Sequence, residues 1–420
     1  MAPVLAPAPP APTTFADLGV PGPIVAVLQR LDRPSPFAIQ VAAVPDALAG
    51  HDVLGRARTG SGKTLAFAIP MVTRLSTSGT RRQKGRPRAL VLVPTRELAQ
   101  QVHDALRPLA EPMGQRTTTV VGGVSQGAQV TALRRGVDVL VATPGRLEDL
   151  MRQGHLRLDA VEITTLDEAD HMADLGFLPA VRRLLDATPA RSQRLLFSAT
   201  LDGDVDVLVR RYLDDPRVHS VDEPSGSVPD MKHRLVTVRA QHKRAIVHEM
   251  LSGTERTLAF TRTKHGARAL ARRLTEAGIP SLDLHGNLSQ AARTRNLDAF
   301  HRGQVRVLVA TDIAARGIHV DDVGLVVHVD PPAEHKAYLH RSGRTARAGS
   351  AGTVVTIATT EQRSDVRSLL RKANVTAVEE HRGEEAGSPA EADAGSSRPG
   401  RPASVTRPAP RGRRRRRPRR

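Results

Sequence analysis

The segment from Ala57 to Thr64, which reads Ala-Arg-Thr-Gly-Ser-Gly-Lys-Thr, constrains the fold of this chain more than any other. Val53 and Leu54 before it predict the end of a short buried strand, and Leu65 and Ile69 after it recur at helical spacing. A strand that turns through glycines into a helix can wrap backbone N–H groups around an anion, and the helix N-terminus adds its positive dipole end. The segment therefore predicts a phosphate-binding loop.

The side chains of this segment match that prediction. Lys63 can reach the β- and γ-phosphates of a nucleotide, and the Thr64 hydroxyl can ligate magnesium. The backbone of the loop would come from Thr59, Gly60, Ser61 and Gly62. The strict pattern has glycine where Ala57 stands, so the alternative is a flexible Gly/Ser loop before an ordinary helix.

Length and charge restrict the class of protein. With 420 residues we expect two domains plus tails. The formal net charge of +19 indicates a polyanionic partner such as nucleic acid. Residues 398–420 supply eleven arginines and no acid, and the rest of the chain is itself mildly basic. Cysteine is absent, which excludes disulfides and cysteine-ligated zinc.

We expect a cytoplasmic protein. No stretch approaches the ~20 apolar residues of a membrane span. The N-terminal Ala/Pro run has no basic residue before Arg30, unlike a signal peptide. The abundance of arginine and alanine favours a GC-rich bacterial source.

Apolar runs that alternate with helical patterns predict parallel sheets of the α/β class. Each run ends in small, polar or basic residues, and ligands of open α/β sheets bind at those strand ends. In the first half the runs are 89–93, 117–121, 137–142, 161–166 and 195–197; in the second half they are 258–260, 282–284, 305–310, 324–329 and 353–358. Taken separately, each strand end could be a plain turn between a strand and a helix.

The run 161–166 ends in Asp167-Glu-Ala-Asp170, about a hundred residues beyond the phosphate loop. Asp167 would hold magnesium through water, because that ion dehydrates reluctantly. Glu168 would orient and deprotonate an attacking water. The second half has no phosphate loop, but carries three arginines in His340–Gly349. A hydrolase divided in this way is complete only when its two halves meet.

We expect five segments: a disordered leader (1–14), a first domain (15–213), a linker (214–232), a second domain (233–378) and a disordered arginine-rich tail (379–420).

Taken together, the motifs resemble those of the DEAD-box ATP-dependent RNA helicases over residues 15–375. Alanine at the start of the phosphate loop is usual in that family, so the misfit at Ala57 disappears. The resemblance implies two tandem RecA-like domains that use ATP and Mg²⁺, and bind RNA with little sequence preference. It also implies local separation of short RNA duplexes. A monomer with ribosome or RNA-decay assemblies as candidate partners fits this picture.

The resemblance also assigns residues. Phe15, Gln40, Gly317 and His319 join the phosphate loop in binding the nucleotide. Arg344 and Arg347 act as arginine fingers beside Lys63, Asp167 and Glu168. Coupling of hydrolysis to strand separation falls to Asp170, Ser198, Thr200 and His340. RNA contacts fall to Thr95, Arg96, Gly123, Thr143, Arg146, Arg262, Gln290, Arg293 and Thr311.

One position departs from the family pattern. The family has aspartate near the nucleotide ribose where this chain has His319. Three other readings stay open: a DNA-directed or translocating helicase of the same superfamily, a non-enzymatic RNA-binding protein with this fold, and a ribosome-associated protein whose arginine tail is the functional part. Gln40 with the full acidic tetrad weighs against the first, and intact Lys63, Glu168 and Arg344 weigh against the second.

Overall fold

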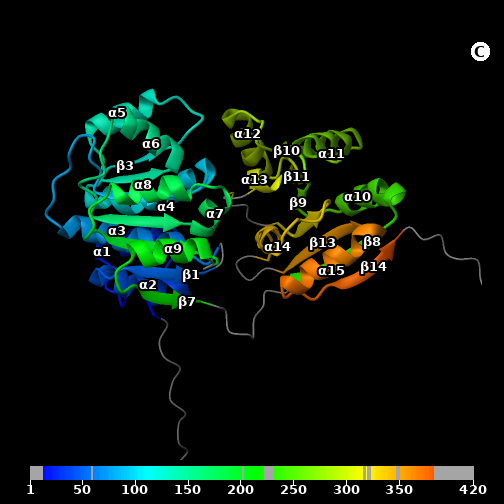
Figure 1. The fold of residues 1–420 in the computed structure, drawn as a ribbon, viewed down its shortest axis with the longest axis horizontal. Coiled ribbons are helices and arrows are strands. Elements are labelled where there is room, and N and C mark those ends of the chain that lie inside the picture. The colour runs from blue at the N-terminus through cyan, green and yellow to red at the C-terminus, as the bar shows by residue number, and fades with distance from the viewer. Residues whose placement is uncertain are drawn as a thin grey trace, which may run out of the picture. The chain divides into compact units, whose positions relative to one another are not determined.

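The computed structural model describes residues 13–57, 60–200, 203–221, 231–315, 318, 323–346 and 351–382 (Figure 1). These residues form two seven-stranded sheets, and every strand pair in them is parallel. The predicted fold class is confirmed. The expected leader and tail lie almost wholly outside the described residues.

The first sheet has the order β3-β4-β2-β5-β6-β1-β7. Its strands are β1 (Val53–Arg56), β2 (Ala89–Leu92), β3 (Thr117–Val120), β4 (Val139–Ala142), β5 (Ile163–Asp167), β6 (Gln193–Ser198) and β7 (Arg217–Ser220). Its helices are α1 (Gly22–Arg30), α2 (Ala38–Ala49), α3 (Lys63–Thr77), α4 (Arg96–Ala110), α5 (Gly127–Arg135), α6 (Pro144–Arg152), α7 (Ala169–Asp174), α8 (Leu178–Asp186) and α9 (Gly203–Tyr212).

The second sheet has the order β10-β11-β9-β12-β13-β8-β14. Its strands are β8 (Met231–Val238), β9 (Thr257–Phe260), β10 (Ser281–Leu284), β11 (Val307–Ala310), β12 (Leu325–His328), β13 (Gly352–Thr359) and β14 (Val378–Arg382). Its helices are α10 (Lys243–Leu251), α11 (Lys264–Glu276), α12 (Gln290–His301), α13 (Asp312–Ala315), α14 (His335–Ser342) and α15 (Arg363–Lys372).

The two sheets have the same topology, because each places its successive strands in the order third, fourth, second, fifth, sixth, first, seventh. Helices cover both faces of each sheet (Figure 1). In the first sheet, α1–α4 pack on one face and α5–α9 pack on the other. In the second sheet, α12–α15 pack on one face and α10–α11 pack on the other. Burial on both faces explains why the central strands are nearly continuous apolar runs.

Two short edge strands differ from the expected segments. β7 lies inside the span expected as linker and pairs with β1, and β14 lies in the span expected as tail and pairs with β8. Both are polar and largely exposed, because an edge strand has only one neighbour and less apolar cover. The first sheet therefore extends to Ser220 and the second to Arg382. No helix in the described part of the chain is long and apolar enough to cross a bilayer.

Candidate active site

The phosphate loop connects β1 to α3, as the sequence predicts. Gly60 and Gly62 have φ of 92° and 89°, a backbone conformation that glycine adopts without steric cost. Gly62 is the N-cap of α3, so the first turn of that helix presents its free N–H groups at the loop. Thr59, one of the four residues predicted to supply the loop backbone, lies outside the described residues.

The Lys63 side chain reaches the acidic tetrad. Its ammonium Nζ donates to Oε1 of Glu168 at 3.2 Å, and both side chains are largely buried. Asp167 ends β5, and its Oδ1 accepts the Glu168 N–H at 3.0 Å. The structure thus gathers the lysine and both carboxylates at the carboxyl ends of β1 and β5.

Burial and charge move the pKa values of these groups in different directions. Burial raises the pKa of Asp167 to about 7, although the positive charge of Lys63 opposes the shift. Burial also disfavours ionisation of Glu168, but the charges of Lys63 and His171 outweigh it and lower the pKa of that carboxyl to about 2. The carboxylates in turn raise the pKa of Lys63 against the effect of its burial.

Two motif residues have strained backbones. Glu168 has φ 55° and ψ 50°, and Ala346, between Arg344 and Arg347, has φ 55°. Left-handed conformations are costly for residues with a Cβ and persist where the surrounding structure holds them. Both residues lie in segments that the sequence assigned to chemistry, whereas the other non-glycine residues with positive φ, Asp32, Asp215 and Asn374, do not.

The four predicted coupling residues meet at Asp170. Its Oδ2 accepts hydrogen bonds from the backbone N–H and the hydroxyl of Thr200, at 3.0 and 3.1 Å. Its own N–H donates to the Ser198 hydroxyl at 3.3 Å, and Nε2 of His340 lies 4.0 Å from its carboxylate. Strands β5 and β6 are neighbours in the sheet, which brings these two strand ends together.

Of the predicted arginine fingers, the structure describes Arg344 and not Arg347; Gly317 and His319 also lie outside the described residues. Arg344 is buried, and its Nη1 donates to the Ile318 carbonyl at 2.5 Å. Arg341 was not predicted as a site residue, yet it binds Asp312 through two hydrogen bonds of 2.5 and 2.7 Å. The sequence did contain a signal for this pair: an acid, Asp312, follows one candidate site residue, Thr311, and a base, Arg341, follows another, His340.

The predicted RNA-contact residues all follow the carboxyl ends of strands. In the first half, Thr95 and Thr143 are the N-caps of α4 and α6, and Arg146 donates to the Val124 carbonyl at 3.2 Å. The Arg96 guanidinium packs against Gly123, where an added Cβ would collide with it.

In the second half, Thr311 directly follows β11 and Arg262 lies two residues after the end of β9, and the Arg262 N–H donates to the Asp330 carboxylate at 3.0 Å. Gln290 accepts from Arg96 at 3.0 Å. Arg293 forms an ion pair of 2.8 Å with Glu97, the acid next to Arg96, which sequence reasoning left out of the candidate set.

Two of the residues predicted to bind the nucleotide, Phe15 and Gln40, are buried. Phe15 is 1% exposed within the apolar core. Gln40 is also 1% exposed, and both ends of its amide are engaged: Oε1 accepts the Phe37 N–H at 2.9 Å and Nε2 donates to the Gly62 carbonyl at 2.9 Å. Gln40 therefore links the start of α2 to the phosphate loop.

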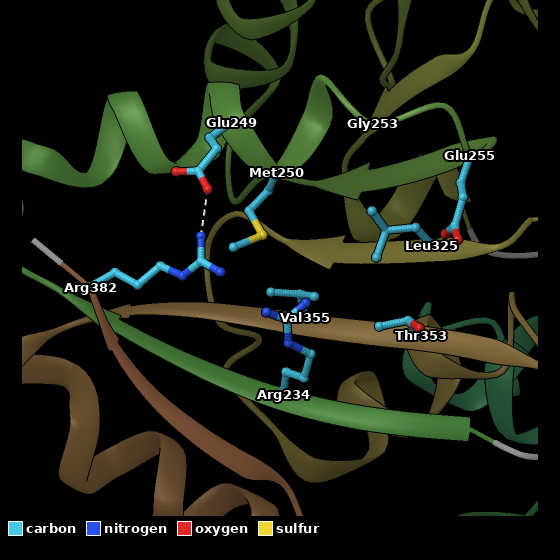
Figure 2. Close-up of a pocket in the computed structure, with 9 residues that line it drawn as sticks. All are labelled: Arg234, Glu249, Met250, Gly253, Glu255, Leu325, Thr353, Val355 and Arg382. Atoms are coloured by element: carbon cyan, nitrogen blue, oxygen red, sulfur yellow. Dashed lines mark hydrogen bonds and ion pairs between the residues drawn. The ribbon is translucent and has the colours of Figure 1, made fainter.

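A separate cavity of about 270 Å³ lies between α10 and the second sheet (Figure 2). It is lined by Arg234, Glu249, Met250, Gly253, Glu255, Leu325, Thr353, Val355 and Arg382. Arg382 and Glu249 form an ion pair of 2.5 Å across it, and Leu325 and Thr353 lie near the amino ends of their strands. None of the predicted site residues lines this cavity.

A parallel-sheet phosphate loop, a lysine and an acid pair at adjoining strand ends, and a second sheet with buried arginines define the class of nucleotide hydrolases with two RecA-like halves. Residues 37–208 match the DEAD/DEAH box helicase family, and residues 242–349 match the helicase conserved C-terminal domain. The chain belongs to the DEAD-box ATP-dependent RNA helicase family.

Individual relatives agree. The chain is 36% identical to the ATP-dependent RNA helicase RhlB of Pseudomonas syringae, over 82% of this chain and 89% of the relative. It is 43% identical to the chloroplastic DEAD-box ATP-dependent RNA helicase 3A of Zea mays, over 85% of this chain and 49% of the relative. It thus spans about half the length of the maize protein.

Among solved structures, S. cerevisiae Dbp5 bound to RNA and ADP BeF3 matches with a TM-score of 0.77 and 26% identity, over 88% of this chain and 95% of that one. Mss116p bound to ssRNA and AMP-PNP matches with a TM-score of 0.77 and 27% identity, over 90% of this chain and 81% of that one.

Proposed function

We propose that this chain hydrolyses ATP in response to RNA and uses the cycle to separate short RNA duplexes and remodel RNA–protein complexes locally. The observation that carries the proposal is the contact of Lys63 with Glu168 beside Asp167, at the loop that would hold the phosphates. The family membership and the RNA-bound structures of its relatives support it.

The residues around the loop suit a magnesium nucleotide. Asp167 is a buried carboxyl, and its raised pKa shows that nearby positive charge does not fully compensate for its burial. A divalent cation would supply the missing positive charge. Asp167, through water, and the Thr64 hydroxyl would hold Mg²⁺, which neutralises phosphate charge when bound. The free N–H groups of α3 and the ammonium of Lys63 would bind the phosphates.

Glu168 becomes a better base when Lys63 leaves it. The lysine charge is the main influence lowering the pKa of Glu168, and a triphosphate competes for that ammonium because it carries more negative charge. As Lys63 turns to the phosphates, the pKa of the Glu168 carboxyl rises, and the carboxylate can orient and deprotonate the attacking water. The ion pair thus holds the base inactive until substrate binds.

RNA would complete the site through the second half. Arg344 and Arg347 are assigned to the γ-phosphate, where arginine fingers are worth about 10³–10⁵ in rate. If RNA binds residues of both halves and stabilises the complete site, ATP and RNA must strengthen each other's binding. Asp170 with Ser198, Thr200 and His340 would transmit that coupling, since Asp170 bonds directly to the segment after β6.

The proposed partner is RNA contacted along its sugar–phosphate backbone, because aromatic residues are only 2% of the chain and stacking platforms are few. We further propose a cytoplasmic monomer that works on ribosome or RNA-decay assemblies.

The proposal is tested by strand separation. A 10-base-pair RNA duplex should be separated with ATP, with or without a single-stranded extension, and a 30-base-pair duplex should resist. Equal activity on both lengths with a strict requirement for one extension polarity would favour a translocating helicase. RNA binding with no separation and no hydrolysis would favour a non-enzymatic RNA-binding protein.

A further inference from the structure

The amino ends of the first sheet carry a concentration of positive charge. Four segments lie there, one before each of β2, β3, β4 and β5, and we call them the amino-edge surface: residues 78–88, 114–116, 134–138 and 155–162. They contain nine Arg or Lys residues, three acids and no aromatic residue.

This charge is not a requirement of the fold, since the second sheet has the same topology and lacks it. Before β2, β3 and β4 the segments hold eight bases and one acid. The corresponding segments before β9, β10 and β11 hold three bases and one acid: residues 252–256, 278–280 and 302–306. The excess of positive charge therefore belongs to the first sheet in particular.

Hydrogen bonds join the four segments into one surface. The Gly85 carbonyl accepts the Arg157 N–H at 2.9 Å. The Arg82 guanidinium donates to the Gly114 carbonyl at 2.7 Å and to the Asp138 carboxylate at 2.6 Å. The first segment is thus bound to each of the other three, and its basic side chains are held on a fixed backbone.

Most of the exposed positive charge on this surface is unpaired. The three acids are all engaged by bases of the surface, in the ion pairs Asp138–Arg82, Asp138–Arg88, Glu162–Arg88, Asp159–Arg86 and Asp159–Arg157. Five further bases are exposed and form no ion pair with a described acid: Arg81, Lys84, Arg116, Arg134 and Arg135. Arginine side chains present their N–H donors in a fixed fork that matches phosphate oxygens. The surface is therefore suited to a ligand with many phosphates.

We propose that the amino-edge surface binds the sugar–phosphate backbone of RNA, as a second RNA site in the first half of the chain. The Lys63–Glu168 pair and the predicted RNA-contact residues of this half lie at the carboxyl ends of the strands, on the opposite edge of the same sheet. Strands β2, β3 and β4 have four residues each, which separates the two edges by about 13 Å. A short single strand bound at the carboxyl ends does not reach the amino edge, whereas a structured region beside that strand does.

The composition of the surface determines how it recognises RNA. Without an aromatic side chain it offers no platform for base stacking, so it contacts phosphates and reads no sequence. RNA is the polyanion that this family of proteins meets as substrate, which favours RNA over an acidic protein as the occupant. The inference goes beyond the proposed function, because hydrolysis of ATP does not require this second site.

The first test compares two RNAs: a 10-nucleotide single strand, and a hairpin that carries the same strand as an extension. In the full chain, four exposed bases are neutralised together: Arg81→Gln, Lys84→Gln, Arg134→Gln and Arg135→Gln. Hairpin affinity should fall at least about tenfold, and its slope of log affinity against log salt should become shallower by up to about 3. Affinity for the single strand should stay within about twofold of wild type, because that strand does not reach the surface.

The matched control also removes three arginines and one lysine, all exposed near the ends of α11 and α15: Arg272→Gln, Arg273→Gln, Arg371→Gln and Lys372→Gln. It should change the affinity for either RNA by less than about twofold, because these residues lie outside the amino-edge surface. An equal loss in the control would show a general effect of charge and overturn the inference.

Two other results would also overturn it. Unchanged hairpin affinity would mean that the surface serves another polyanion, such as an acidic protein. Equal loss for both RNAs would make the surface part of the main RNA site. ATP hydrolysis with saturating single strand should be the same in the wild type and the four-residue variant. If the wild type shows no such hydrolysis, the proposed function fails, and the hairpin comparison still decides the role of the surface.

The second test needs no substitution. Lys84 and Lys372 are both exposed lysines, and only Lys84 lies in the amino-edge surface. Acetylation of the full chain, followed by mass spectrometry, should show Lys84 protected by the hairpin and not by the single strand. Lys372 should react equally in all samples. Equal reactivity of Lys84 with and without the hairpin contradicts the inference.

Discussion

The ammonium of Lys63 lies 3.2 Å from Oε1 of Glu168, a residue 105 positions further along the chain. Parallel pairing places the end of β5 two strands from the end of β1, with β6 between them, so the two motifs share one edge of the sheet. The same contact lowers the pKa of Glu168 and leaves its carboxylate a weak base until Lys63 has another partner. If Lys63 binds the phosphates and Glu168 is the catalytic base, as proposed, this one contact links substrate binding to activation of the base.

This contact predicts two different failures. Lys63→Ala and Glu168→Gln should each reduce RNA-stimulated ATP hydrolysis at least a hundredfold, the first by removing a phosphate contact and the second by removing the base. ATP binding should weaken only in Lys63→Ala. Glu168→Gln should therefore retain RNA in the presence of ATP, as measured by filter binding.

The matched control is Glu148→Gln, which removes a carboxylate of the same half. Its partner Arg183 is largely exposed, so their ion pair contributes little. Near-normal turnover in Lys63→Ala or Glu168→Gln would contradict the assignment of the site.

The sequence predicted which residues stand at strand ends, because central parallel strands are apolar runs with clear ends. It did not predict β7, β8 or β14. Arg-Val-His-Ser and Val-Glu-Glu-His-Arg carry no apolar pattern, the first half of β8 is polar, and the pairing of all three strands is non-local. It also did not predict that Gln40 is buried. The Gln40 side chain accepts a hydrogen bond from the backbone N–H of the N-cap residue, whose own side chain cannot accept one. A sequence motif does not show this contact.

The arginine tail should act as an electrostatic anchor for RNA. Each phosphate neutralised contributes about −0.7 to the slope of log affinity against log salt for single strands. Full-length protein should therefore show a markedly steeper slope than a truncation at residue 394, which removes the eleven arginines of 398–420. Both proteins should hydrolyse ATP, as the site lies in the sheets. Equal slopes would refute the anchor.

His319 lies outside the described residues, and we expect it to lower the affinity of the nucleotide site for ATP modestly. A neutral imidazole offers one acceptor where the family aspartate offers a charged carboxylate. The difference is about 1 kcal/mol, or tenfold or less in affinity. His319→Asp should improve apparent ATP affinity within that range and leave the maximal RNA-stimulated rate unchanged, as measured by ATP titration. A collapse of turnover would show that the histidine has a role of its own.

A buried histidine should make stability depend on pH. Burial holds the pKa of His328 well below its usual value, and the charges of Arg341 and His233 add to the effect. Its Nδ1 bonds to the Thr356 hydroxyl at 3.0 Å, and the Tyr338 ring packs edge-on at 4.9 Å. As the pH falls below about 6.5 the unfolded chain takes up a proton that the folded protein refuses, so the free energy of unfolding declines by up to about 1.4 kcal/mol per pH unit.

Urea denaturation at pH 7.5, 6.5 and 5.5 measures this dependence. His328→Asn should flatten it relative to the wild type, and His301→Asn, at an exposed position ending α12, should not. An unchanged profile in His328→Asn would show that other groups control the acid stability.

The most direct measurement of the central claim is steady-state ATP hydrolysis by the full chain with no nucleic acid, with single-stranded RNA and with DNA of the same sequence. The account predicts a low basal rate, a rise of at least tenfold with RNA, little response to DNA, and loss of the RNA-dependent rate in Glu168→Gln. A wild-type rate that RNA does not raise, or one that survives in Glu168→Gln, would contradict it.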